Sequence, residues 1–115
     1  MSNLINRKKI GEKFYYNYPN PDTNVNIKII TSPEYRTKGE EFILVKNVDS
    51  CKVILDSSTT KHIIVKTMTN VIISSFMGKI DEDYDEVKIG RGACVEFICI
   101  ENQWYIVSSD GLKMS

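Results

Sequence analysis

The chain has 115 residues, of which 42% are hydrophobic and 26% charged, and its 15 basic and 15 acidic side chains give a formal net charge of zero. This size predicts one globular domain over residues 1–115. The balanced charge gives no reason to expect nucleic acid or an anionic membrane as a partner. The apolar runs are far shorter than the roughly 20 residues of a membrane-spanning helix. Residues 1–10 lack the apolar core of a signal peptide, so none is predicted.

The first 24 residues differ in character from the rest of the chain. A basic cluster at Arg7–Lys9 precedes an aromatic run, Phe14–Tyr18, and then Pro19 and Pro21. The two prolines favour an extended backbone and mark a boundary. Two interpretations stay open. Residues 1–24 are an arm that attaches to a neighbouring subunit or a larger assembly, or the aromatic run is the first strand of the domain.

Short segments rich in β-branched residues recur along the chain, and the apolar residues do not follow a helical period. Turn-forming residues separate these segments. Many short strands at this spacing predict an all-β fold, either an antiparallel β-sandwich or a β-prism, jelly-roll-like in type. The predicted strands are Lys13–Tyr18, Val25–Ile30, Glu41–Lys46, Lys52–Asp56, His62–Lys66, Val71–Ser75, Glu86–Ile89, Ala93–Ile100 and Gln103–Ser108.

The central strands are apolar at consecutive positions, namely in Phe42–Val45, Val53–Leu55, Ile63–Val65 and Val71–Ile73. A strand with one solvated face alternates apolar and polar residues, so these strands are expected to bury both faces. No predicted helix is available to cover the outer faces. We therefore predict an oligomer, with one face of each strand in the subunit core and the other at an interface. The candidate interface residues are Ile43, Val45, Ile64, Ile72 and Trp104.

The end of the chain carries the clearest local pattern. Gly90 and Gly92 precede an apolar strand, a polar turn at Glu101–Gln103, and an aromatic strand that begins with Trp104. This order predicts a β-hairpin. The segment from Lys38 to Lys113 resembles the closing part of viral and phage fibre modules.

The fibre resemblance implies a trimeric, non-enzymatic virion structural protein, associated with a fibre or a capsid and made in the host cytoplasm. A trimer fits fibre-like β modules best, and cyclic closure is the usual way in which such subunits assemble. The implied partners are other copies of the chain, other virion structural proteins, and a glycan or receptor on the host surface. No cofactor is implied.

Aromatic residues supply the candidate binding residues: Tyr15, Tyr16, Trp104 and Tyr105. An exposed aromatic side chain beside polar groups is typical of a sugar platform. Neighbouring residues of a strand point to opposite faces, so one of Trp104 and Tyr105 is expected in the core or at a subunit interface. A glycan- or receptor-binding head remains an alternative function.

The acidic segment Gly78–Val87 resembles the third motif of trimeric deoxyuridine triphosphatases. In that family the aspartate that matches Asp81 activates the hydrolytic water, and the tyrosine that matches Tyr84 stacks on the deoxyribose. The motif's glycine after the Tyr-x pair is missing, and the chain has no Arg-Ser-Ser phosphate segment. Phosphoryl chemistry would therefore lack its electrostatic support. A diverged nucleotide hydrolase is the alternative, and we predict that the protein is not an enzyme.

The same segment has two further interpretations. Asp81, Asp83 and Asp85 alternate, so an extended chain would place three carboxylates on one side, as a cation site requires. A solvated acidic turn explains them equally simply and is the interpretation we favour. The single histidine, His62, has no nucleophile motif around it and is expected to be a hydrogen-bonded structural residue.

Overall fold

A computed structural model describes residues 26–114, with side chains described as far as Gly111. This range contains β-strands and no helix, so the all-β prediction is confirmed, and it offers no helix long and apolar enough to cross a bilayer. The strands are β1 (Ile27–Ile30), β2 (Glu34–Arg36), β3 (Phe42–Val45), β4 (Ser50–Leu55), β5 (His62–Thr67), β6 (Asn70–Ser75), β7 (Glu86–Ile100) and β8 (Gln103–Met114).

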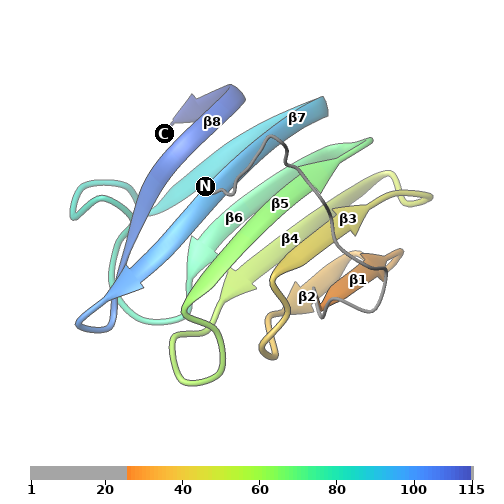
Figure 1. Cartoon of the computed structure of the whole chain (residues 1–115). Helices are drawn as coiled ribbons and strands as arrows, with labels where there is room; N and C mark the ends of the chain where they lie inside the picture. The colour runs from red at the N-terminus through yellow and green to blue at the C-terminus, as the bar shows by residue number, and fades with distance from the viewer. Residues whose placement is uncertain (1–25, 115) are drawn as a thin grey trace, which may run out of the picture.

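The first six strands alternate between two walls, which we call the odd wall (β1, β3 and β5) and the even wall (β2, β4 and β6). The chain crosses from one wall to the other after each strand, and every pairing within a wall is parallel. Figure 1 shows the strands of the odd wall in front and those of the even wall behind them. Each wall therefore has a face that points toward the other wall and a face that points outward.

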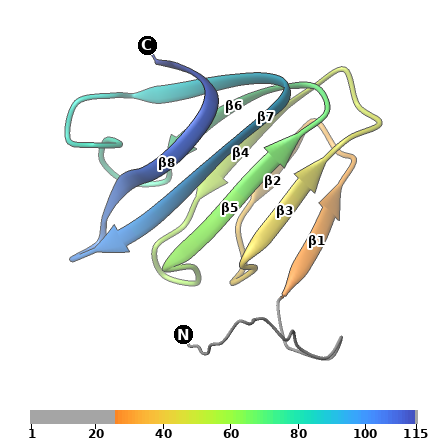
Figure 2. The same ribbon diagram turned by 45° about the horizontal axis from the view of Figure 1, so that its top comes forward.

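Strand β7 joins the two walls. Its first part pairs antiparallel with β6 through Glu86–Ile89, and its second part pairs antiparallel with β5 through Cys94–Ile98. Between them lies a bend at Gly90–Gly92, where the regular register with β8 is interrupted and Gly92 has a φ of 85°. The result is one sheet in the order β1-β3-β5-β7-β6-β4-β2 that folds back on itself into a nearly closed, barrel-like shape (Figure 2).

The parallel pairing corrects the predicted antiparallel architecture. Strands of parallel sheets read as continuous apolar runs because both of their faces are covered. The runs in β3 to β6 stand in such parallel strands, although in the single chain only their inward faces are fully buried. The antiparallel prediction holds only for the pairs that β7 makes. The predicted strands Glu86–Ile89 and Ala93–Ile100 form one continuous strand, and the short strand β2 was not predicted. The predicted strand Lys13–Tyr18 lies outside the described residues.

The predicted hairpin is confirmed by the pairing of β7 with β8. Ile100 pairs with Gln103, which leaves Glu101 and Asn102 as a two-residue turn with φ values of 53° and 64°. Positive φ at both positions is the geometry of a type I′ turn, whose twist matches that of the flanking strands. The hairpin lies at the end of the stack of strands opposite to β1 and β2 (Figure 1).

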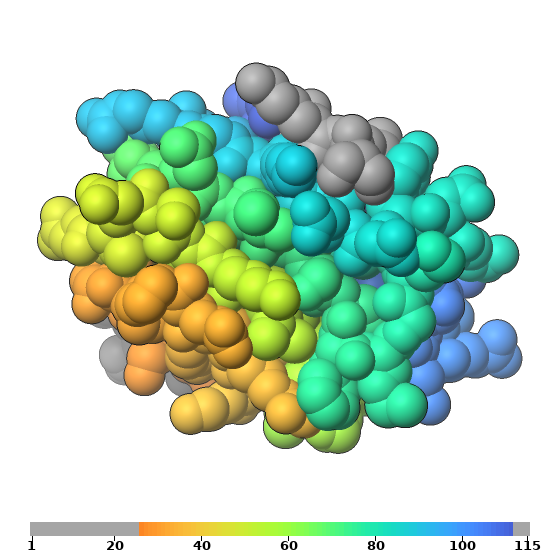
Figure 3. Space-filling model, turned by 180° about the vertical axis from the view of Figure 1, so that it is seen from behind, coloured from red at the N-terminus to blue at the C-terminus, as the bar shows by residue number. Residues whose placement is uncertain are grey.

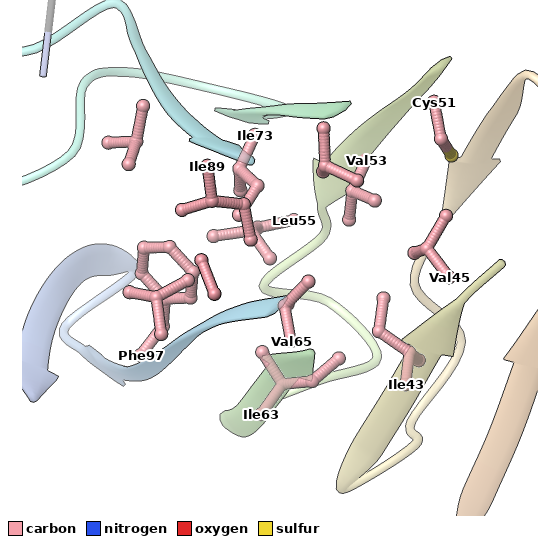
Figure 4. Close-up of a cluster of buried hydrophobic side chains, with 14 of the residues drawn as sticks. Ile43, Val45, Cys51, Val53, Leu55, Ile63, Val65, Ile73, Ile89 and Phe97 are labelled. Atoms are coloured by element: carbon pink, nitrogen blue, oxygen red, sulfur yellow. The ribbon is translucent and has the colours of Figure 1, made fainter. Parts of the chain in front are cut away.

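The core lies between the two walls. Figure 4 shows side chains from both walls pointing toward one another, among them Ile43 and Val65 of the odd wall and Val53 and Ile73 of the even wall. Trp104 and Phe97 are the largest of the fully buried side chains. Each fully buried aliphatic or aromatic side chain contributes roughly 1.5–3 kcal/mol relative to exposure, so this interior is the main source of stability.

A buried polar cluster joins the carboxyl ends of β2 and β4. The Asp56 carboxylate accepts hydrogen bonds from the backbone and the hydroxyl of Ser58 at 2.9 and 2.7 Å, and from Arg36 Nε at 2.8 Å. The backbone N–H of Asp56 donates to the Thr37 hydroxyl at 2.9 Å. The bonds from Ser58, and then the one from Arg36, lower the Asp56 pKa to about 2.

We expect Asp56→Asn to destabilise the fold at neutral pH but not in strong acid. The folded-state pKa of Asp56, about 2, lies below the unfolded value of about 3.9. Its stabilising contribution is therefore complete above the unfolded pKa and is lost as pH falls toward the folded one. Urea unfolding of both proteins between pH 7 and pH 2 measures this, with the exposed Asp49→Asn as control. A difference in stability that does not change with pH would contradict the assignment.

Candidate functional site on the outer face of the odd wall

The outward side of the odd wall is apolar. Ile27 pairs with Phe42, and Phe42 pairs with Ile64, while Ile29 pairs with Leu44 in the next row. Paired residues of neighbouring strands point to the same side of a sheet, so these five side chains form one patch, which we call the apolar face. Ile27 and Ile29 are 60% and 54% exposed, and the other three are half-buried.

Charged side chains of both signs border the apolar face. Lys66 pairs with Leu44, and Glu96 pairs with Ile64. Glu96 also lies 2.5 Å from His62 Nε2 and accepts a 3.0 Å hydrogen bond from the Ser108 hydroxyl. The bond with His62, followed by the one from Ser108, lowers the Glu96 pKa. The hydrogen bond predicted for His62 is therefore present, and it holds the Glu96 carboxylate at the edge of the patch.

The even wall has a different outer surface. Its outward row places Ile72 between Lys52 and Lys88, because Ile72 pairs with each of them. The short strand β2 adds Glu34 and Arg36 at the edge of this wall. Figure 3 shows the molecule from behind, the side on which β4 and β6 lie. Within residues 26–111, an apolar face that spans three strands is found on the odd wall and not on this one.

The predicted interface residues separate into two groups. Ile64 lies on the apolar face, and Ile72 points outward from the even wall and is 36% exposed. Ile43, Val45 and Trp104 are interior residues with exposures of 0%, 0% and 1%, which corrects their expected place at an interface. In β3 the prediction chose the inward-facing residues Ile43 and Val45. The outward ones are Phe42 and Leu44, and the outward Ile27 and Ile29 were missed although they stand in a predicted strand.

Within the described residues, Trp104 and Tyr105 do not form an exposed binding platform. Trp104 is buried in the core, and Tyr105 is half-buried with its hydroxyl donating to Glu82 at 2.7 Å. That hydrogen bond is the main cause of the raised Tyr105 pKa. Tyr15 and Tyr16 lie outside the described residues.

The acidic segment is a turn that covers the free edge of β8. Asp81 and Glu82 have positive φ values of 54° and 65°, so the chain is not extended there, and the three aspartates do not line up. The Asp81 carboxylate accepts the backbone N–H of Ile106 at 2.9 Å, and the Asp81 N–H donates to the Trp104 carbonyl at 2.9 Å. Asp85 is paired with Lys79. Among residues 26–111, no cluster of three potential metal ligands is found.

We expect Asp81→Asn to change the free energy of unfolding by only about half a kcal/mol, because an amide oxygen still accepts the Ile106 N–H. Asparagine also tolerates the left-handed backbone. Asp81→Ala removes the acceptor and places an alanine at positive φ, so we expect a loss of about 1–2 kcal/mol. Denaturant unfolding of both variants measures the difference. Equal stability of the two variants would contradict a structural role for the carboxylate.

The resemblance to deoxyuridine triphosphatases rested on Asp81 and Tyr84. The Asp81 carboxylate is used in covering β8, and Tyr84 is half-buried against the hydrophobic core with its backbone bonded to Ile80. No protein-family model, curated protein or solved structure significantly matches this chain. The function is therefore argued from the fold and its surfaces.

Proposed function

We propose that the protein is a non-enzymatic structural protein that assembles with copies of itself through the apolar face. The observation that carries the proposal is the contiguous outer patch of Ile27, Ile29, Phe42, Leu44 and Ile64. Contiguous apolar patches of this kind mark interaction sites, because leaving them in water is unfavourable. The carboxylates of the acidic segment are engaged within the fold, where Asp81 accepts the Ile106 N–H and Glu82 accepts the Tyr105 hydroxyl.

Other copies of the chain are the partner that the charges favour. The border of the patch carries Lys66 as well as the His62–Glu96 pair, and the whole chain has no net charge. A border with both signs is complementary to a symmetry-related copy of itself, whereas a border of one sign would repel such a copy. The fibre resemblance supports a homotrimer, in which three odd walls face a common axis and the even walls face outward. Other virion structural proteins are the further partners in this proposal.

The experiment is a measurement of molar mass by light scattering after size-exclusion chromatography at micromolar concentration. We expect the mass of three 13.2 kDa chains. The oligomer should persist at high salt, because an apolar interface is not weakened by screening of charges. A single-chain mass throughout the micromolar range would contradict the proposal, and a stable dimer or tetramer would support self-assembly while correcting the number of copies.

A further inference from the structure

A surface groove lies at the bend of β7. It consists of two hollows of about 310 and 390 Å³ that share Gly90. The first is lined by Asn70, Ile72 and Lys88, and the second by Arg91, Gly92 and Asp110. These volumes fall within the range of sites that bind small molecules. The smaller hollow lies on the outer side of the even wall, opposite to the apolar face. The larger one lies at the bend itself, where the Gly92 carbonyl accepts a 2.7 Å hydrogen bond from Lys66 Nζ.

The groove gathers polar groups from three strands. Lys88 and Asn70 stand beside Ile72 at the first hollow, and the Asn70 amide oxygen would be only 3.7 Å from a Cβ atom added at Gly90. At the second hollow, Arg91 Nη1 donates to the Met68 carbonyl at 3.2 Å, which fixes one end of the guanidinium. Asp110 also lines this hollow. The Gly92 position has open space around it, because an added Cβ would meet no atom within 4 Å.

This combination of groups selects one class of ligand. Two cationic side chains, Lys88 and Arg91, favour a carboxylate, which a guanidinium binds with two parallel hydrogen bonds. Lys88 Nζ lies 4.0 Å from a carboxylate oxygen of Glu86, and the carboxylate of the ligand would compete for it. Asp110 opposes a highly charged anion, and as a pure acceptor it suits the hydroxyl groups of a sugar ring. The Asn70 amide both donates and accepts, as such hydroxyl groups require. A neutral sugar would offer no anionic group to the two cations. A simple anion would lie near the negative charge of Asp110 without offering it a hydrogen-bond donor.

We propose that this groove binds an acidic monosaccharide, a sugar ring of hexose size that carries one carboxylate, at the end of a glycan chain. The carboxylate lies between Lys88 and Arg91, the ring hydroxyls reach Asp110 and Asn70, and the small residue at 90 lets the ring approach the backbone. The binding does not depend on the oligomer. Several copies on one particle would, however, raise the effective affinity for a surface that carries many such sugars.

The test is an amide NMR titration of the full chain with glucuronic acid and with N-acetylneuraminic acid, which represent the two common sources of this chemistry. Glucose and acetate are the controls. We expect saturable shifts at Asn70, Gly90 and Gly92 with a dissociation constant in the range of about 1 mM. Saturable binding of glucuronic acid, of N-acetylneuraminic acid or of both supports the proposal, and the tighter binder identifies the source. No saturable shift with either sugar, or equal binding of acetate or glucose, overturns it.

Three variants locate the site. Gly90 has no positive φ and an added Cβ would make only ordinary contacts, so Gly90→Leu fills the junction of the two hollows without backbone strain. We expect Gly90→Leu and Arg91→Gln each to weaken binding at least tenfold. Lys52→Gln, outward on the same wall but outside the groove, should bind as the parent does. Unchanged binding by Arg91→Gln overturns the proposal even if Gly90→Leu fails to fold. Light scattering on the same samples reports assembly separately.

Discussion

Ile64→Asp is expected to convert the oligomer into folded single chains. Ile64 points outward on the apolar face, in the row between Phe42 and the border residue Glu96. In the single chain the new carboxylate remains in contact with water. In the assembly it would be buried without a partner and beside the negative charge of Glu96, which typically costs several kcal/mol. Light scattering should show the mass of one chain, while circular dichroism should show an unchanged β spectrum.

The neighbouring residue supplies a matched control. Ile63 is fully buried on the other side of the same strand, so Ile63→Asp is expected to unfold the subunit. Ile72→Asp places the same charge outward on the even wall, beside Lys52 and Lys88, and should leave both folding and assembly unchanged. If Ile64→Asp keeps the parent's molar mass, the apolar face is not the interface. If Ile64→Asp unfolds like Ile63→Asp, the outward placement of Ile64 is wrong.

Local sequence patterns predicted the strands but not the way they pair. A β-branched run and a following turn are local features, so most strands and the β7–β8 hairpin were found within a few residues. Whether two strands run parallel depends on where the chain returns after each crossing, which is a long-range property. The short strand β2 (Glu34–Arg36) follows Pro33 and contains two charged residues, so it has no apolar run to reveal it.

The candidate sites, too, were predictable where they depend on local sequence and not where they depend on strand pairing. The apolar runs predicted an outer apolar surface. Which alternate residues of β3 face outward is set by the register between β1, β3 and β5, and this register turns Ile43 inward and Phe42 outward. The turn at Asp81–Glu82 was expected to be solvated, and its left-handed backbone has no marker such as glycine. The groove was missed because Asn70 and Lys88 come from different strands, and only the bend at Gly90 brings Arg91 beside them.

Trp104→Ala is expected to destabilise the fold strongly. Trp104 is 1% exposed, pairs with Cys99 across the hairpin, and forms a bridge to Ile80. Truncation leaves a large cavity and removes much of what holds β8 against the core. Such changes cost roughly 3–5 kcal/mol, against a total stability of about 5–15 kcal/mol for a domain. Urea unfolding of the two proteins measures the loss, and the oligomer should weaken with the fold.

Trp104→Phe separates the packing of the ring from the contribution of its polar atom. The indole N–H of Trp104 is buried and has no hydrogen-bond partner among the described residues, so its removal forfeits no such bond. We therefore expect Trp104→Phe to cost clearly less than Trp104→Ala. Because Trp104 is the only tryptophan, the parent's emission should be blue-shifted and resistant to iodide. Emission like that of free tryptophan, together with an Ala variant as stable as the parent, would show that the side chain lies in water.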